Sequence, residues 1–168
     1  MGKDRNFLEK PNIIAEIANS HGGNYEKALE IIESIPFEFV NELKFQIYTG
    51  NDLCSKHNPR YNHFLNQSFS KKEWEGIINF AKSKNFIIDA DIFGLEALDI
   101  ALENNLKRFK IHSSDTLNAP LLENIGRYAE LVFISAGGTF LEEIEYSIKK
   151  LLDFKLEESQ IVIMHGFQ

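Results

Sequence analysis

The chain has 168 residues, 43% of them hydrophobic and 26% charged, which suits one globular domain with a sizeable core. The formal net charge is −7 and no basic stripe is present, so the composition excludes a nucleic-acid-binding surface. No apolar run is long enough to cross a membrane, and the only cysteine, Cys54, cannot form an internal disulfide. We therefore expect a cytoplasmic protein.

Short apolar runs alternate with amphipathic stretches along the chain. After a polar leader at residues 1–10, strands are predicted at residues 13–18, 43–48, 86–92, 108–112, 131–135 and 161–164. Apolar residues at helical spacing predict helices at residues 25–35, 71–84, 95–104, 120–128 and 141–152. Ser70 and Glu73 have the spacing of a capping box, and Thr139 is predicted to cap the last helix. Residues 49–68 are expected to form a long polar loop, a length typical of lids and binding loops.

This alternation of strands and helices predicts a parallel sheet. The fold class is therefore α/β, and we expect a TIM (β/α)8-type barrel with about six of its eight βα units in residues 11–168. No Gly-x-Gly-x-x-Gly motif follows the first strand, which disfavours a dinucleotide-binding domain.

Two predicted strands carry lysines between apolar neighbours. Lys44 and Gln46 share one strand face because side chains alternate, and Lys110 and His112 repeat the pattern. Barrel enzymes build their active sites at the C-terminal ends of such strands. An interior lysine is costly to bury unless it meets an anion. That anion could be a substrate group, or a carboxylate of a neighbouring strand in a structural ion pair.

Hydroxyls and carboxylates follow other strands. Ser113 and Ser135 could join the two lysines around a phosphate and a carboxylate group, with help from the Gly137–Gly138 turn. Glu16 could act as a general base or neutralise a lysine, and Asp115 could perform acid–base chemistry.

Further candidates have weaker signals. Asp89 and Asp91 share one face of the third strand and could hold a hydroxylated substrate. His21 and His165 are candidate metal ligands, although a hydrogen-bonded structural role is more common for a lone histidine. No HExxH motif or Cys/His cluster is present.

Several segments resemble motifs of the sialic acid synthases. In chain order they are IAEI at 14–17, SHGG at 20–23, LKFQ at 43–46, FKIHSSD at 109–115, ISAGG at 134–138, LEEI at 141–144 and MHG at 164–166. The chain departs from that family at residues 90–94, where the family has STPFD, and at residues 165–168, where it has HCTS. His112 and Asp115 also replace a glycine and a glutamate. These departures leave the acceptor sugar open.

The resemblance implies a function and a set of roles. Sialic acid synthases condense phosphoenolpyruvate with an N-acetylated amino sugar, such as N-acetylmannosamine, to a sialic or other nonulosonic acid and release phosphate. The residues that would bind phosphoenolpyruvate are Lys44, Lys110, Ser113 and Ser135. Those near the sugar or the reacting carbon would be Gln46, Asp115 and Gln168, with Glu16 close to the reaction centre.

The resemblance also implies features outside this chain. A divalent metal, Mn²⁺ or Mg²⁺, would be held by ligands beyond residue 168, so none is assigned here. A C-terminal antifreeze-like domain would be absent, and the full-length protein would be a homodimer. We therefore expect an incomplete catalytic domain that does not turn over substrate alone.

Two alternatives remain at this point. One is a related phosphoenolpyruvate-dependent synthase with a sugar-phosphate acceptor, for which Lys56 and Arg60 are the available cations. The other is a non-catalytic, anion-binding remnant that pairs with another chain.

Overall fold

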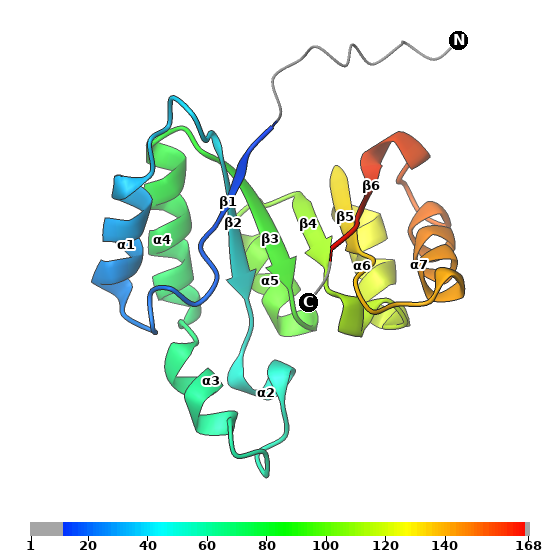
Figure 1. The fold of residues 1–168 in the computed structure, drawn as a ribbon, viewed down its shortest axis with the longest axis horizontal. Helices are drawn as coiled ribbons and strands as arrows, with labels where there is room; N and C mark the ends of the chain where they lie inside the picture. Colours follow the sequence, from blue (N-terminus) through cyan, green and yellow to red (C-terminus); the bar gives the residue numbers. More distant parts are fainter. Residues whose placement is uncertain (1–11, 167–168) are drawn as a thin grey trace.

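Six parallel strands form one sheet, in the order in which they occur in the chain (Figure 1). The structure is a computed structural model that describes residues 12–166; the predicted leader at residues 1–10 and Gln168 lie outside this range. The strands are β1 (Ile14–Glu16), β2 (Glu42–Ile47), β3 (Ile87–Ile92), β4 (Arg108–Ile111), β5 (Leu131–Ser135) and β6 (Ile161–Met164). All six predicted strands are thus confirmed, with ends that differ by a few residues.

Helices connect the strands and cover one face of the sheet, while the other face is concave and open (Figure 1). The main helices are α1 (Tyr25–Ser34), α4 (Lys71–Ser83), α5 (Leu95–Glu103), α6 (Ala119–Tyr128) and α7 (Leu141–Leu152). A short 3₁₀ turn, η2 (Glu158–Gln160), precedes β6. These successive βα units form a curled half-barrel, which fits the prediction of six of the eight units of a closed barrel.

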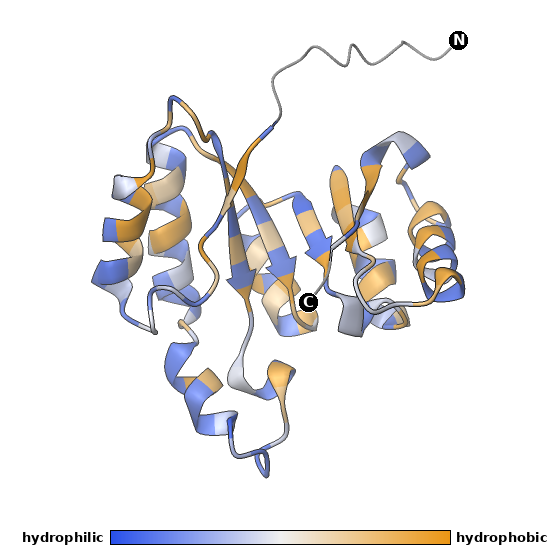
Figure 2. Ribbon diagram, in the orientation of Figure 1, coloured by the Kyte–Doolittle hydropathy of each residue, from blue (hydrophilic) through white to orange (hydrophobic). Residues whose placement is uncertain are grey.

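The core lies between the sheet and the helices. Phe45 and Phe109 point out of the sheet into it, at 1% and 0% exposure. Trp74 of α4 meets the Phe45 ring edge-on, with ring centroids 5.8 Å apart. In Figure 2, α1 turns its hydrophobic residues toward α4 and its hydrophilic residues outward, and the two helices are in contact. Burial of these apolar faces is the main stabilising term.

Two short helices lie within residues 49–68, so the prediction of one continuous polar loop there was wrong. They are α2 (Gly50–Leu53) and α3 (Tyr61–Gln67). The Thr49 N–H and hydroxyl both donate to Asp52 at 2.8 Å, which caps α2. The Tyr61 hydroxyl donates to Asn51 at 2.9 Å and joins the two helices. Local polar contacts therefore order this segment where an apolar periodicity is lacking.

The cap prediction for α4 is confirmed, whereas the one for α7 was wrong. Ser70 and Glu73 form the expected reciprocal capping box, with the Ser70 N–H 2.8 Å from the Glu73 carboxylate. At α7 the N-cap residue is Phe140, whose N–H donates to Glu143 at 2.8 Å. The Thr139 hydroxyl instead donates to the Ala136 carbonyl at 3.0 Å, so it closes the preceding turn.

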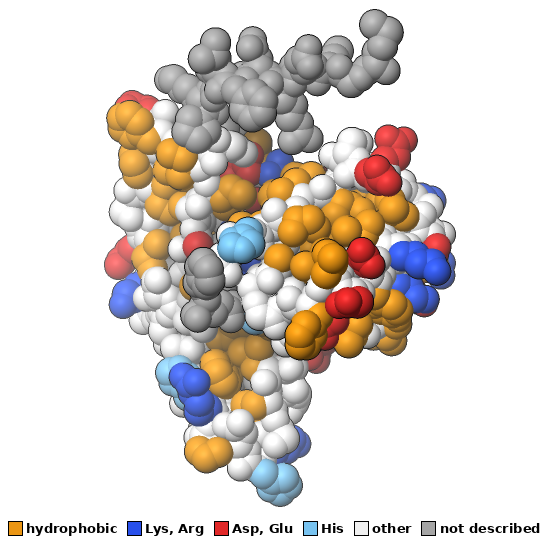
Figure 3. Space-filling view, turned by 45° about the vertical axis from the view of Figure 1, so that its right-hand side comes forward, with side chains coloured by type: hydrophobic (Ala, Val, Ile, Leu, Met, Phe, Trp, Pro, Cys, Tyr) orange, Lys and Arg blue, Asp and Glu red, His pale blue; other side chains and the backbone are white. Residues whose placement is uncertain are grey.

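Apolar side chains gather on the surface near β6 and α7 (Figure 3). Val162 and Ile163 of β6 are 37% and 43% exposed, and Phe140 and Leu141 are 74% and 66% exposed. β6 is an edge strand of the sheet, so its outer backbone groups are unpaired within it. Among the described residues, no helix is both long and apolar enough to span a membrane.

The Ser70 cap gives a test of the fold. We expect Ser70→Ala to lower the free energy of unfolding by about 1 kcal/mol, because the first turn of α4 loses its capping hydroxyl. Ser83→Ala, at the exposed end of the same helix, is the matched control and should change it by less than about 0.5 kcal/mol. Urea denaturation followed by circular dichroism measures both. Equal effects would show that the capping box does not stabilise α4.

Candidate active site

Charged side chains line the concave face of the sheet on four neighbouring strands. Lys44 of β2 is in register with Asp89 of β3, and Asp91 of β3 with Lys110 of β4. Gln46 is also in register with Asp91 and is half-buried. The apolar residues between them enter the helix layer, as the alternation in the sequence predicts.

Both predicted anion-binding lysines are already paired with carboxylates. The Lys44 ammonium lies 2.8 Å from Glu16 of β1, and its side chain is 10% exposed. The Lys110 ammonium forms an ion pair with Asp91. The structure therefore shows the ion-pair alternative for each lysine, and it places Glu16 where it neutralises one.

A third ion cluster lies at the N-terminal ends of the strands, and the sequence reasoning missed it. The Arg108 guanidinium donates to Asp89 and to Glu42, each at 2.5 Å. Asn12 also donates to Glu42, at 2.5 Å. The sequence did contain a signal for it. Arg108 lies two residues before Lys110 and Glu42 two residues before Lys44, so each shares the strand face of that lysine.

The concave face is close to electrically balanced. Its ion pairs join three cations, Lys44, Arg108 and Lys110, to four carboxylates, Glu16, Glu42, Asp89 and Asp91. Each cation of this face is therefore already paired with a carboxylate, so the face does not present a free positive charge to an anion. An anionic substrate would have to exchange with one of the carboxylates.

Burial acts strongly on the two aspartates of β3. Desolvation raises the pKa of Asp89, and hydrogen bonding and charge attraction from Arg108 oppose it. Desolvation also raises the pKa of Asp91, with Lys110 as the main opposing group. Each carboxylate keeps one buried oxygen without a hydrogen-bond partner among the described residues, Oδ2 of Asp89 and Oδ1 of Asp91. The prediction that either holds a substrate hydroxyl stays a prediction.

The turn after β4 holds two of the predicted site residues. Ser113 and Asp115 lie in the 3₁₀ turn η1 (Ser113–Asp115), and both are half-buried. Asp115 accepts a hydrogen bond from Asn118 at 2.9 Å and one from Ser114 at 3.1 Å. Asn118 in turn caps α6. Asp115 therefore supports the start of this helix at the C-terminal end of the barrel strand.

Ser135 ends β5 on the same side of the sheet, in register with Met164 of β6. It is half-buried, and the Ala136 N–H in the turn that follows donates to the Met164 carbonyl at 2.9 Å. The structure thus brings the ends of β1, β2, β4 and β5 to one rim of the sheet, with their predicted residues.

His21 has a structural role. It is 3% exposed, and its Nδ1 accepts a hydrogen bond from the Gly23 N–H at 3.0 Å. Its ring packs on Phe69, with centroids 4.4 Å apart. Burial lowers the pKa of His21, so the neutral ring is favoured. These contacts fit the hydrogen-bonded alternative rather than a metal ligand.

Within residues 12–166, no three His, Cys, Asp or Glu side chains form a cluster that could hold a metal ion. His165 directly follows β6 and is exposed. The expected divalent metal therefore stays a prediction.

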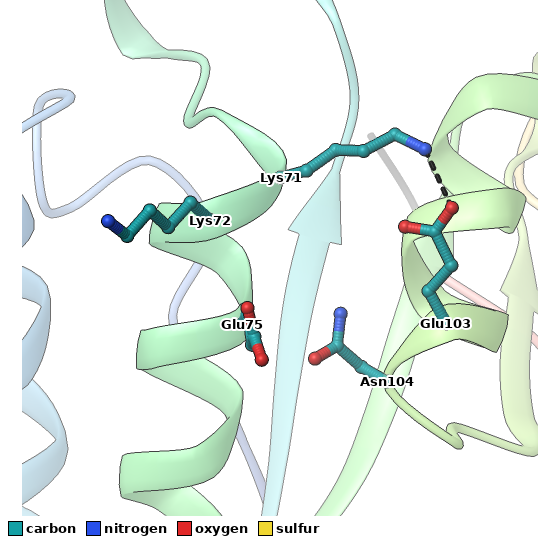
Figure 4. A pocket seen from close by; sticks show the side chains of 5 residues that line it. All are labelled: Lys71, Lys72, Glu75, Glu103 and Asn104. Atoms are coloured by element: carbon teal, nitrogen blue, oxygen red, sulfur yellow. Dashed lines mark hydrogen bonds and ion pairs between the residues drawn. The ribbon is translucent and has the colours of Figure 1, made fainter.

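A groove on the outer surface is a poorer candidate. It lies between α4 and α5 and is lined by Lys71, Lys72, Glu75, Glu103 and Asn104 (Figure 4). Lys71 reaches across to Glu103 at 2.8 Å, and both side chains are more than half exposed. Figure 4 shows Lys72 pointing away from the other four. The groove belongs to the helix layer, away from the residues at the strand ends.

These features define part of a parallel (β/α) barrel with polar residues at the C-terminal ends of its strands. The chain belongs to the NeuB family, whose model matches residues 33–168. The likeness to the sialic acid synthases is thereby confirmed at the level of the family.

Known proteins support this placement. The chain is 26% identical to N,N'-diacetyllegionaminic acid synthase of Campylobacter jejuni, over 94% of this chain and 52% of that protein. A crystal structure of N-acetylneuraminic acid synthetase from Leptospira borgpetersenii superposes with a TM-score of 0.83 and 27% identity, over 93% of this chain and 54% of that one. The chain therefore spans about half the length of these relatives.

A more distant structure supports the barrel fold alone. Phospho-2-dehydro-3-deoxyheptonate aldolase from Thermotoga maritima superposes with a TM-score of 0.63 at 20% identity, over 90% of this chain and 40% of that one. The predicted TIM-barrel class, with about six of eight units, is thus confirmed.

The Arg108 cluster gives a stability test. We expect Arg108→Ala to lower the free energy of unfolding by about 3–5 kcal/mol at pH 7.5, because two carboxylates stay in place without their cation. Loss of Arg108 removes the groups that oppose the raised pKa of Asp89, so the defect should shrink as the pH falls and the carboxylate takes a proton. Lys71→Ala breaks an exposed pair and should leave the stability nearly unchanged. Urea titrations at pH 7.5 and 5.0 test this, and a pH-independent defect contradicts it.

Proposed function

We propose that this chain forms part of the catalytic barrel of a synthase that condenses phosphoenolpyruvate with an N-acetylated amino sugar. The observation that carries the proposal is the placement of Lys44 and Lys110 on the concave face of a NeuB-family half-barrel. The names of the relatives, a legionaminic acid synthase and a sialic acid synthetase, support a nonulosonic acid as the product class.

Phosphoenolpyruvate matches the groups on this face. It carries a phosphate and a carboxylate, and the face offers two ammonium groups plus the Ser113 and Ser135 hydroxyls at the ends of β4 and β5. Under the proposal Lys44 and Lys110 release Glu16 and Asp91 to bind these anions. Each ammonium keeps an anionic partner in this exchange, while each released carboxylate needs water or a proton in place of its lysine.

The proposed reaction forms a carbon–carbon bond and a carbon–oxygen bond from water, and it breaks the carbon–oxygen bond to phosphate, while the aldehyde oxygen takes up a proton to become a hydroxyl. Carbon 3 of the enolpyruvate attacks the sugar aldehyde, water adds to carbon 2, and phosphate leaves from the same carbon. In this scheme Glu16, once freed from Lys44, lies at the strand rim as a general base for the water. Gln46 and Asp115 would contact the sugar near the reacting carbon, and Gln168 would join them from outside the described residues.

The anion pocket can be tested by calorimetry. We expect the chain to bind phosphoenolpyruvate equally with and without Mn²⁺, and Lys44→Ala and Lys110→Ala each to weaken binding by about tenfold or more through loss of a charge-assisted hydrogen bond. Lys71→Ala, in the outer groove, is the matched control and should bind like the wild type. Absence of binding by a chain shown to be folded would contradict a pocket in these strands.

Turnover separates the enzyme from the alternatives. Release of phosphate from phosphoenolpyruvate that depends on N-acetylmannosamine supports the synthase. Dependence on a sugar phosphate instead identifies the related synthase class. Binding without release supports a non-catalytic anion site.

A further inference from the structure

Asp91 is a fully buried carboxylate that holds the Lys110 ammonium on the concave face. Its side chain is 0% exposed, and Lys110 contacts only its Oδ2. Its Oδ1 is buried and has no hydrogen-bond partner among the described residues. A buried carboxylate with unused hydrogen-bonding capacity costs stability. Asp91 is therefore poorly explained as a residue that only stabilises the fold.

Charged groups surround Asp91 from its own strand and from the strands on either side. They are Asp89 on β3, Lys44 on β2, Glu16 on β1, and Arg108, Lys110 and His112 on or just after β4. Of these, Lys110 and His112 favour its ionised form and Glu16 disfavours it. On the opposite face of the sheet, α5 presents the buried apolar residues Ala97, Leu98 and Ile100. The protonation state of Asp91 is thus set by the charged groups on the concave side of the sheet.

The two lysine pairs differ in how easily they open. Glu16 is 35% exposed, so it can leave Lys44 and remain in water. Asp91 lies mid-sheet between Gln46 and Lys110 and cannot reach solvent by rotation of its short side chain. An anion that approaches Lys110 therefore meets a fixed negative charge, which Glu16 does not impose at Lys44.

We propose that Asp91 is a specificity-determining residue that competes with anionic substrates for Lys110 and yields it only when it takes up a proton. The proton comes from solvent and converts the carboxylate to a carboxylic acid. The Lys110 ammonium keeps its charge and forms its ion pair with the anion instead of with Asp91. Burial already favours the protonated form, and a second anion beside it favours that form further. The inference rests on the proposed function for the identity of the anion, but the competition itself concerns any anion at Lys110.

Sulfate is the probe that separates this inference from the proposed reaction, because it needs neither acceptor sugar nor metal and stays a dianion between pH 5 and 8. We expect wild-type affinity for sulfate to fall as the pH rises, with proton uptake on binding. At a pH above the pKa that Asp91 has in the complex, the affinity for sulfate is lower by about tenfold for each unit by which bound sulfate raises that pKa. Asp91→Asn should therefore bind sulfate at least about tenfold more tightly at pH 7.5, with a flatter pH profile and reduced proton uptake.

The matched control is Asp89→Asn, which removes the other buried carboxylate of the same strand face but is paired with Arg108 instead of Lys110. It should leave sulfate affinity within about twofold of the wild type. Lys110→Ala in the Asp91→Asn background should abolish the gain. If Asp91→Asn fails to fold, Asp91→Thr removes the same charge with a residue that suits a strand. Equal affinity of the folded variants and the wild type at pH 7.5, or no proton uptake by the wild type, overturns the inference.

Isothermal titration in two buffers of different ionisation enthalpy gives both the affinity and the proton count. If Asp91→Asn gains sulfate affinity but no synthase activity is found, the competition stands and the proposed reaction fails. If the wild type condenses phosphoenolpyruvate while Asp91→Asn gains nothing, the proposed function stands and the inference fails.

Discussion

The burial of charge on the concave face is the constraint on which the rest of this structure depends. Three cations and four carboxylates lie on β1 to β4, and each cation meets a carboxylate from a neighbouring strand. An unpaired charge there would cost several kcal/mol, so the pairs fix the register of the strands. A slip of one residue would turn Lys44 into the helix layer and Phe45 onto the concave face. Ion pairs on one side and apolar packing on the other thus select the same register.

The charge is unevenly distributed across the sheet. On β4, Lys110 is in register with Phe133 of β5, and Phe133 is in register with Val162 of β6. The polar concave-face residues of β1 to β4 are therefore followed by apolar residues on β5 and β6. The hydrophobic surface near β6 in Figure 3 continues this apolar part. The charged side chains that could hold an anion are confined to the first four strands. The apolar strands contribute to the proposed site only at their ends, through Ser135.

The sequence was informative about which face a residue occupies and much less about what it contacts. Alternation along a single strand predicts that Lys44 and Gln46 share a face, and this prediction is confirmed. The partner of Lys44 depends on the register between strands, which follows from tertiary packing that a lone sequence does not reveal. Arg108 was missed for the same reason, because its partners are 19 and 66 residues away in the chain.

Local elements show a similar limit. The main helices were predictable from their apolar periodicity, while α2 and α3 are four and seven residues long and contain no complete apolar stripe. Polar caps such as Thr49 with Asp52 hold them instead. The error at Thr139 has a similar origin, since a threonine hydroxyl can bond to several nearby backbone groups and this one donates to the Ala136 carbonyl of the preceding turn.

The proposed competition at Lys110 falls on a residue where this chain departs from the sialic acid synthases it resembles. In the resemblance drawn from the sequence, residues 90–94 stand where the family has STPFD, which sets the carboxylate of Asp91 against the threonine of that motif. The backbone of β3 continues through this position without interruption, and the neighbouring Ala90 and Ile92 are fully buried. A difference of this kind alters the charge on the concave face while the packing behind it is retained. Specificity in such a barrel can therefore diverge through one concave-face residue, because the helix-facing half of each strand already secures the fold.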